Sequence, residues 1–360
     1  MEAFMNSTGK LTKVGQGFCG TVWAAETATS GTLVIKRADG GPGRSLPNEQ
    51  YIHIRILDAV KEQRRSCDTR NPADRQDRIE AHRRIKVNIP YNHAFLEQAS
   101  SLWPTILPRF PDGFAACEAL LSERIPPMNL AVRELLSSHY CPSKHQATQL
   151  ARDKSNESCL VRPYLGRRRP EQSGGGPKQR FFSLRNFPLH VDQMEELALP
   201  VEAYATAMAD TLAFLHWIVK IDANDMEFVL APARACAQDG AEDNVEDDAT
   251  PSIGDEHLFS DAFGVHSMWI LDFDCCKVLE MNSEGMRRAA MCFWRNDPFY
   301  PRPGAKNEED QRLWRVFEQR FLERSALLLR GESDEIKTLP DVLIRTIRDN
   351  RDTWTKGAIN

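Results

Sequence analysis

The sequence predicts an α+β protein whose first third is rich in strands and whose remainder is mostly helical. Residues 9–36 alternate β-branched and small residues around a Thr-Ser-Gly turn at 29–31, which predicts three short antiparallel strands. Residues 201–219 repeat apolar side chains with a period of 3.6 over about five turns, which predicts a long amphipathic helix. A length of 360 residues corresponds to about two domains and is ample for a large core.

Composition excludes several classes of protein. The net charge of −5 and the pI of about 6.0 argue against a generally basic nucleic-acid binder. The nine cysteines are an odd number without a Cys-x-x-Cys pair, which disfavours both a disulfide framework and the common zinc patterns. The chain begins without an apolar leader and has no run of about 18 apolar residues. We therefore expect an intracellular protein, cytoplasmic or nuclear, that is neither secreted nor bound to a membrane and that needs no zinc.

The remaining elements follow from local patterns. A helix is expected from Asn48, because Ile52, Ile56 and Val60 recur every four residues and a basic tail follows. The polar residues 66–84 that come next have no apolar stripe and indicate a surface insertion. Further elements are expected as strands at 85–95 and 117–125 and as helices at 129–136, 308–329 and 341–349. These patterns divide the chain into a sheet domain over residues 8–128 and a helical domain over residues 129–360.

Two charged insertions interrupt the helical domain. Residues 162–185 hold seven basic residues against one acid and include Ser-Gly-Gly-Gly-Pro, which predicts a mobile basic loop. Residues 238–256 carry eight acids and no base, which predicts a disordered acidic insertion. Either insertion offers a surface for a protein partner.

A glycine-rich run and a strand lysine form the first candidate site. Residues 15–22 read GQGFCGTV, with Gly15, Gly17 and Gly20 between two strands, and Lys36 follows 16 residues after Gly20 inside the strand Val-Ile-Lys. A dinucleotide site would require a helix after the third glycine, and here the sheet continues. A glycine hairpin with a strand lysine is typical of backbone that covers phosphates and one ammonium that reaches them. A simple flexible β-turn is the alternative.

Carboxylates after two later elements form the second candidate site. Asp222 opens a polar loop between the long helix and an apolar strand, where a general base is readily held, although Asp is also common in ordinary turns. Asp272 ends the apolar strand 268–271, where a carboxylate at the edge of the core favours a metal ion as partner. A solvated strand end is the alternative for Asp272.

The order of these features resembles the protein kinase fold, which implies a bilobal α+β architecture that binds ATP and magnesium. In this resemblance Lys36 matches the lysine that pairs with phosphates, Glu49 the helix glutamate that pairs with the lysine, Asp222 the catalytic base, and Asp272 the magnesium ligand of Asp-Phe-Gly. The three glycines would cover the phosphates.

The segment LLSERIP at 120–126, with Glu123 and Ile125, resembles the strand and hinge whose backbone binds adenine. The chain departs from the kinase pattern at three places. Glu227 stands where the family has a metal-binding Asn, Lys220-Ile221 replace His-Arg, and Asp274 replaces the glycine of Asp-Phe-Gly. Glu227 remains a candidate magnesium ligand, because carboxylate oxygens suit this ion.

Two functions therefore stay open, a divergent phosphotransferase and a pseudokinase scaffold that acts through protein contacts. A third function, weak nucleic-acid binding through the basic loop, is disfavoured by the net charge.

A narrower resemblance is to uncharacterised fungal proteins with a domain of unknown function, often labelled "zinc finger protein". It is carried by the motifs SERIPP, CLVRPYLGRRR, RFFSLRNFPLH, DANDMEFVLAP, WILDFDCCK and FWRNDPFYPRP. This family implies no activity. Its zinc label lacks support in the sequence, because Cys275 and Cys276 are adjacent and His139, Cys141 and His145 leave a fourth ligand unassigned.

Overall fold

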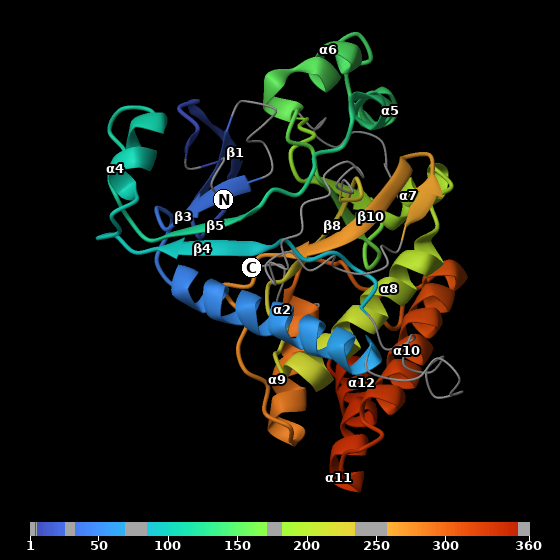
Figure 1. Cartoon of the computed structure of the whole chain (residues 1–360). Helices are drawn as coiled ribbons and strands as arrows, with labels where there is room; N and C mark the ends of the chain where they lie inside the picture. The colour runs from blue at the N-terminus through green and yellow to red at the C-terminus, as the bar shows by residue number, and fades with distance from the viewer. Residues whose placement is uncertain are drawn as a thin grey trace.

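A computed structural model gives an α+β protein built on two five-stranded sheets and a set of helices (Figure 1). It describes Phe4 and residues 6–25, 33–68, 85–170, 182–234 and 258–351. The α+β class predicted from the sequence is confirmed. The expectation of a mostly helical remainder was incomplete, because the second sheet lies wholly after residue 160.

The first sheet is antiparallel throughout, with the strand order β1-β2-β3-β5-β4. Its strands are β1 Leu11–Gln16, β2 Thr21–Ala25, β3 Leu33–Arg37, β4 Asn92–Leu96 and β5 Ala119–Glu123. Alternation along β3 buries Leu33 and Ile35 in a core with Trp23 and Phe110. Because successive side chains point to opposite faces, Lys36 projects to the other face of the sheet.

Helix α2, Leu46–Asp68, packs against β4 and β5 (Figure 1). It also contacts residues 215–219, at the end of the long helix predicted at 201–219. Ile52, Ile56 and Val60 are buried, as the four-residue spacing predicts. The helix begins two residues before the predicted start at Asn48. Glu49 lies in its first turn and is also buried, at 5% exposure, on the side that faces the first sheet.

The second sheet has the strand order β7-β6-β8-β10-β9. Its strands are β6 Val161–Tyr164, β7 Phe187–His190, β8 Glu227–Ala231, β9 Phe259–Asp261 and β10 Gly264–Leu271. β8 and β10 pair antiparallel with Glu227 opposite Leu271, so that the residue after β10, Asp272, lies at the same edge of the sheet as Glu227. This register fixes the position of both predicted metal ligands.

Helices cover the second sheet and build the largest core. The long helix predicted at 201–219 is α8, Val201–Phe214, continued by a π turn at Leu215–Val219, and it packs along α10. Trp217 and Ser325 join the two by a hydrogen bond of 2.7 Å. The remaining helices are α4 Trp103–Ile106, α5 Leu130–Tyr140, α6 Ala147–Arg152, α7 Val191–Glu196, α9 Ser283–Arg295, α10 Glu308–Leu328, α11 Asp334–Lys337 and α12 Leu339–Asp349. Within the described ranges, no helix is both long enough and apolar enough to span a membrane.

The segment predicted as a mobile basic loop, 162–185, is partly ordered structure. Its first residues, 162–164, belong to β6, and residues 182–185 are also described. Arg168 forms ion pairs with Glu195 and Asp310, with N–O distances of 2.6 and 2.7 Å, so its charge is compensated by carboxylates of the same chain. Residues 171–181, the acidic insertion 238–256 and most of the polar insertion 66–84 lie outside the described residues, although 66–68 form the last turn of α2.

The buried ion pair between α8 and α10 gives a test of the core. The Asp210 side chain has no exposure, and its carboxylate accepts two hydrogen bonds, at 2.6 and 2.9 Å, from Arg320. We expect Arg320→Ala to lower the free energy of unfolding by about 3 kcal/mol, because it leaves a buried charge without its partner. Arg312→Ala, also on α10, removes the exposed ion pair with Glu202 of α8 and should lower the free energy of unfolding by less than about 1 kcal/mol. Urea unfolding monitored by circular dichroism compares the two variants, and equal losses would contradict this account.

Candidate functional site

A cavity of about 330 Å³ lies between the first and second sheets. Its wall is formed by the glycine hairpin, β3, the start of α2, the segment after β5 and the edge of the second sheet. Every predicted nucleotide or metal residue lines this one cavity. These residues are Gly15, Gly17, Gly20, Lys36, Glu49, Glu123, Ile125, Glu227 and Asp272.

Lys36 is the centre of the cavity wall. Its Nζ lies 2.7 Å from Glu49 Oε2 and 2.7 Å from Asp272 Oδ1, so one ammonium bridges α2 and the second sheet. Although burial opposes the charge, the two carboxylates raise the pKa of Lys36 above its usual value. Burial raises the pKa of Glu49 to about 7 against the effect of the ammonium. The Asp272 side chain is 28% exposed; although desolvation opposes its charge, Lys36 holds its pKa below the usual value, which keeps this carboxylate charged.

The glycine hairpin closes one side of the cavity. Gly17 donates to the carbonyl of Gly20 at 2.9 Å, and Gly41 donates to the carbonyl of Phe18 at 2.8 Å. A Cβ on Gly20 would lie 1.8 Å from the carbonyl oxygen of Arg37, so the fold requires glycine there. A Cβ on Gly17 would meet nothing within 4 Å. The fold therefore does not require glycine at position 17, and the open space beside this residue is available to a ligand.

Glu227 faces the same space from the start of β8. Its carboxylate makes a close ion pair with Arg162 of β6, whose guanidinium also lies 3.4 Å from Asp297. Burial raises the pKa of Glu227 to about 7, and Arg162 opposes the rise. Glu227 thus adds a further partly buried carboxylate to the cavity wall, and Arg162 balances its charge.

Asp222 does not join this group. Its side chain is 2% exposed, lies outside the cavity wall, and accepts hydrogen bonds from the backbone amides of Lys277 at 2.8 Å and Asn224 at 3.2 Å. The Arg288 Nε lies 3.4 Å from its second oxygen, and burial raises its pKa. The carboxylate of this loop that does line the cavity is Asp225.

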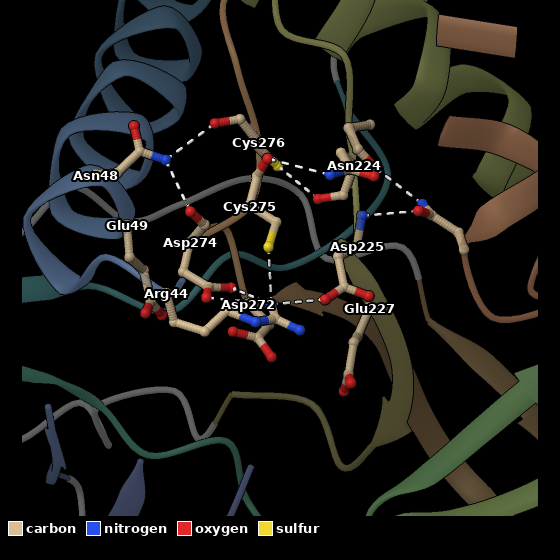
Figure 2. A network of polar contacts seen from close by, with 12 residues as sticks. Arg44, Asn48, Glu49, Asn224, Asp225, Glu227, Asp272, Asp274, Cys275 and Cys276 are labelled. Carbon is tan, nitrogen blue, oxygen red and sulfur yellow. Dashed lines mark hydrogen bonds and ion pairs between the residues drawn. The ribbon is translucent and has the colours of Figure 1, made fainter. Parts of the chain in front are cut away.

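Arg44, which the sequence analysis missed, connects Asp225 to the strand end (Figure 2). Its Nη1 lies 2.6 Å from Asp225 Oδ2, 3.0 Å from Asp274 Oδ1 and 2.9 Å from Cys275 Sγ. Asn48 of α2 donates to the carbonyls of Asp274 and Cys276, each at 2.9 Å. A lone arginine in the Gly-Gly-Pro-Gly loop before α2 carries no periodic signal, so only the tertiary structure shows its role.

The hinge residues take different parts in the wall. The Glu123 carboxylate accepts from the backbone of Tyr91 at 3.0 Å and from Arg234 at 2.6 Å, so it fixes the segment after β5. Its backbone amide donates to the carbonyl of Tyr91. Ile125 offers the cavity an apolar side, together with Leu160 and Leu271, with which it packs around Trp269.

Comparison with known proteins gives one match. Residues 268–333 match the model of a family of unknown function described as "Zinc finger protein". The match covers the last four residues of strand β10, the following residue Asp272, and the whole of helices α9 and α10. No curated protein matches the chain, and no solved structure matches it.

The donors in the matched segment do not fit a structural zinc site. The segment contains three cysteines, two of them adjacent, and no histidine, whereas structural zinc takes four nitrogen or sulfur ligands. Among the described residues, one group of three or more His, Cys, Asp or Glu side chains is close enough to share an ion, namely Asp225, Asp274 and Cys275. Two of its three donors are carboxylates and Arg44 lies among them, which does not suit a structural zinc ion.

His53 provides a test of the buried wall behind Lys36. It is 3% exposed, its Nε2 lies 2.6 Å from the carbonyl of Pro90, and its ring lies 5.3 Å from that of Phe273. Burial, aided by the charge of Lys36, lowers its pKa from 6.5 to about 4. In the unfolded chain the ring takes up a proton below pH 6.5, so this group costs stability as pH falls from 6.5 to 4.

We expect the free energy of unfolding of the wild-type chain to fall, between pH 7 and pH 5, by about 2 kcal/mol more than that of His53→Gln. Urea unfolding at the two pH values gives the difference, which removes contributions common to both proteins. Equal losses on acidification would show that His53 is not held neutral by burial.

Proposed function

We propose that this chain is a divergent kinase-like protein that binds ATP with magnesium in the cavity between its two sheets and transfers a phosphoryl group. The supporting observation is the position of Lys36, bridged to Glu49 and Asp272 and covered by the glycine hairpin. The proposal includes a bilobal arrangement, with the first sheet and α2 as one lobe and the second sheet with its helices as the other.

Four parts of the cavity wall have separate roles in this proposal. The backbone of the hairpin from Gly15 to Gly20 would cover the phosphates, and the Lys36 ammonium would bind them. Asp272 and Glu227 would hold magnesium, which bridges phosphate oxygens and neutralises charge that develops during transfer. The segment 123–125 would bind the base.

Positioning and charge carry most of the catalysis in phosphoryl transfer. In the step itself, the acceptor oxygen bonds to the γ-phosphorus as the bond to the diphosphate breaks, and the acceptor proton passes to a carboxylate.

A second function is favoured by the position of the loop carboxylates. Asp222 lies outside the cavity wall and Asp225 is bound by Arg44, so neither is free to accept a proton in this conformation. A protein with this site would bind nucleotide without transfer and act as a pseudokinase scaffold. The described part of the basic segment offers little to a nucleic acid, since Arg168 and Arg169 are paired with carboxylates of α7 and α10.

Nucleotide binding is tested by titrating a fluorescent ATP analogue into the full chain with and without magnesium. We expect saturable binding that magnesium strengthens, and a loss of at least about tenfold in affinity in Asp272→Asn, which is about 1.4 kcal/mol. Gly17→Val should weaken binding similarly while changing the free energy of unfolding by less than about 0.5 kcal/mol, because the fold leaves that space open.

Matched controls are Glu280→Gln, a carboxylate outside the cavity wall, and Gly331→Val, a glycine with equally open surroundings. Both should bind like the wild type. An absence of binding at millimolar nucleotide, or equal effects in the controls, would reject the proposal.

Turnover separates the transferase from the scaffold. If the chain is an enzyme that uses Asp222 as base, Asp222→Asn should lower turnover of ATP by about 10²-fold or more without weakening nucleotide binding. The geometry predicts instead that Asp222→Asn changes neither, and that its effect is a loss of stability from the missing negative charge beside Arg288. Measurement of ADP release with a coupled assay, beside the binding titration, decides between them.

A further inference from the structure

Arg44 occupies the position in which a cation would contact three ligand atoms at once. One oxygen of Asp225, one of Asp274 and the sulfur of Cys275 all lie within 4.8 Å of one another, a spacing that suits a shared ion. The Nη1 of Arg44 lies 2.6, 3.0 and 2.9 Å from these three residues (Figure 2). The guanidinium therefore stands in the centre of the group.

The surroundings hold this arrangement in place. The Asp274 side chain has no exposure, and a buried carboxylate requires a compensating cation. Asn48 fixes the backbone of Asp274, and the side chain of Asn296 accepts a hydrogen bond of 2.7 Å from the amide of Asp225. On its other side the guanidinium lies 5.6 Å from the ring of Phe18, at the tip of the glycine hairpin. Contacts on both sides of the cavity thus position Arg44.

We infer that Arg44 is a built-in counter-cation that replaces a second divalent ion beside the phosphate site. In its presence Asp225, Asp274 and Cys275 do not take up metal, and a bound nucleotide carries one divalent ion, held by Asp272 and Glu227. The second statement rests on the proposed function, whereas the first concerns the protein without nucleotide. Arg44 is a positioning residue here, since it acts through charge at the edge of the site.

The experiment uses Co²⁺ as the probe, because a thiolate ligand gives cobalt a charge-transfer absorption that oxygen ligands do not. Titration of the nucleotide-free full chain should give no such absorption for the wild type. Arg44→Ala should gain it, with saturation at one equivalent, and should lose it again when Cys275→Ser is added. Arg312→Ala removes an arginine that pairs with Glu202 away from the cavity and should behave like the wild type.

Two results would overturn the inference. The first is a wild-type chain that binds Co²⁺ with the thiolate absorption, which would mean that Arg44 yields its place to metal. The second is a folded Arg44→Ala protein, as shown by circular dichroism, that gains no site. Arg44→Gln repeats the test if the alanine variant does not fold, because its neutral side chain also removes the charge while retaining bulk.

Metal stoichiometry with nucleotide tests the second statement separately. With a non-hydrolysable ATP analogue, the wild type should bind one Mn²⁺ per nucleotide and Arg44→Ala two, as counted from the electron paramagnetic resonance of free Mn²⁺. Two ions in the wild type would overturn this part. If the chain binds no nucleotide, the proposed function and this second statement fall, while the cobalt titration still decides whether Arg44 fills the cation position.

Discussion

The ammonium of Lys36 between Glu49 and Asp272 is the interaction on which the arrangement of the site depends. It joins a strand of the first sheet, the first turn of α2 and the edge of the second sheet, which are distant in sequence. Glu49 is buried, and the side chains of Lys36 and Asp272 are partly buried, with exposures of 15% and 28%, so removal of any one leaves a charge without its partner. The triad therefore sets the distance between the two sheets and so creates the cavity under the glycine hairpin.

The parts of the site that the sequence predicted are those fixed by local periodicity. Lys36 follows Ile35 in an alternating strand, so it had to face away from the core. Glu49 lies one turn before Ile52 and two turns before Ile56, so it lies on the same buried face of α2 as these residues. Asp272 follows a buried strand directly. For these residues a pattern a few positions long determines direction, and the shared cavity follows once the sheets pack.

The loop between α8 and β8 shows where such reasoning stops. Lys220, Ala223 and Asp225 adopt positive φ of 58°, 52° and 60°, a conformation that glycine normally takes and that the sequence of this loop, which has no glycine, does not predict. The turn directs Asp222 toward Lys277 and Asp225 toward the cavity. Strand β6 was not predicted, for a related reason. Arg162 and Pro163 are typical of loops, but Arg162 pairs with the carboxylates of Glu227 and Asp297, which lie 65 and 135 positions later in the chain.

The charge balance around the cavity links the Lys36 triad to Arg44. The cavity wall and the adjoining Asp274 together hold six carboxylates and four cations, formally a deficit of two positive charges, which one divalent ion in the proposed site would supply. Without Arg44 the deficit would be three, and the buried Asp274 would lack its partner. The arginine thus compensates an acidic residue at the position where the kinase pattern has glycine. The groups counted are Lys36, Arg44, Arg124 and Arg162 against Glu49, Glu123, Asp225, Glu227, Asp272 and Asp274.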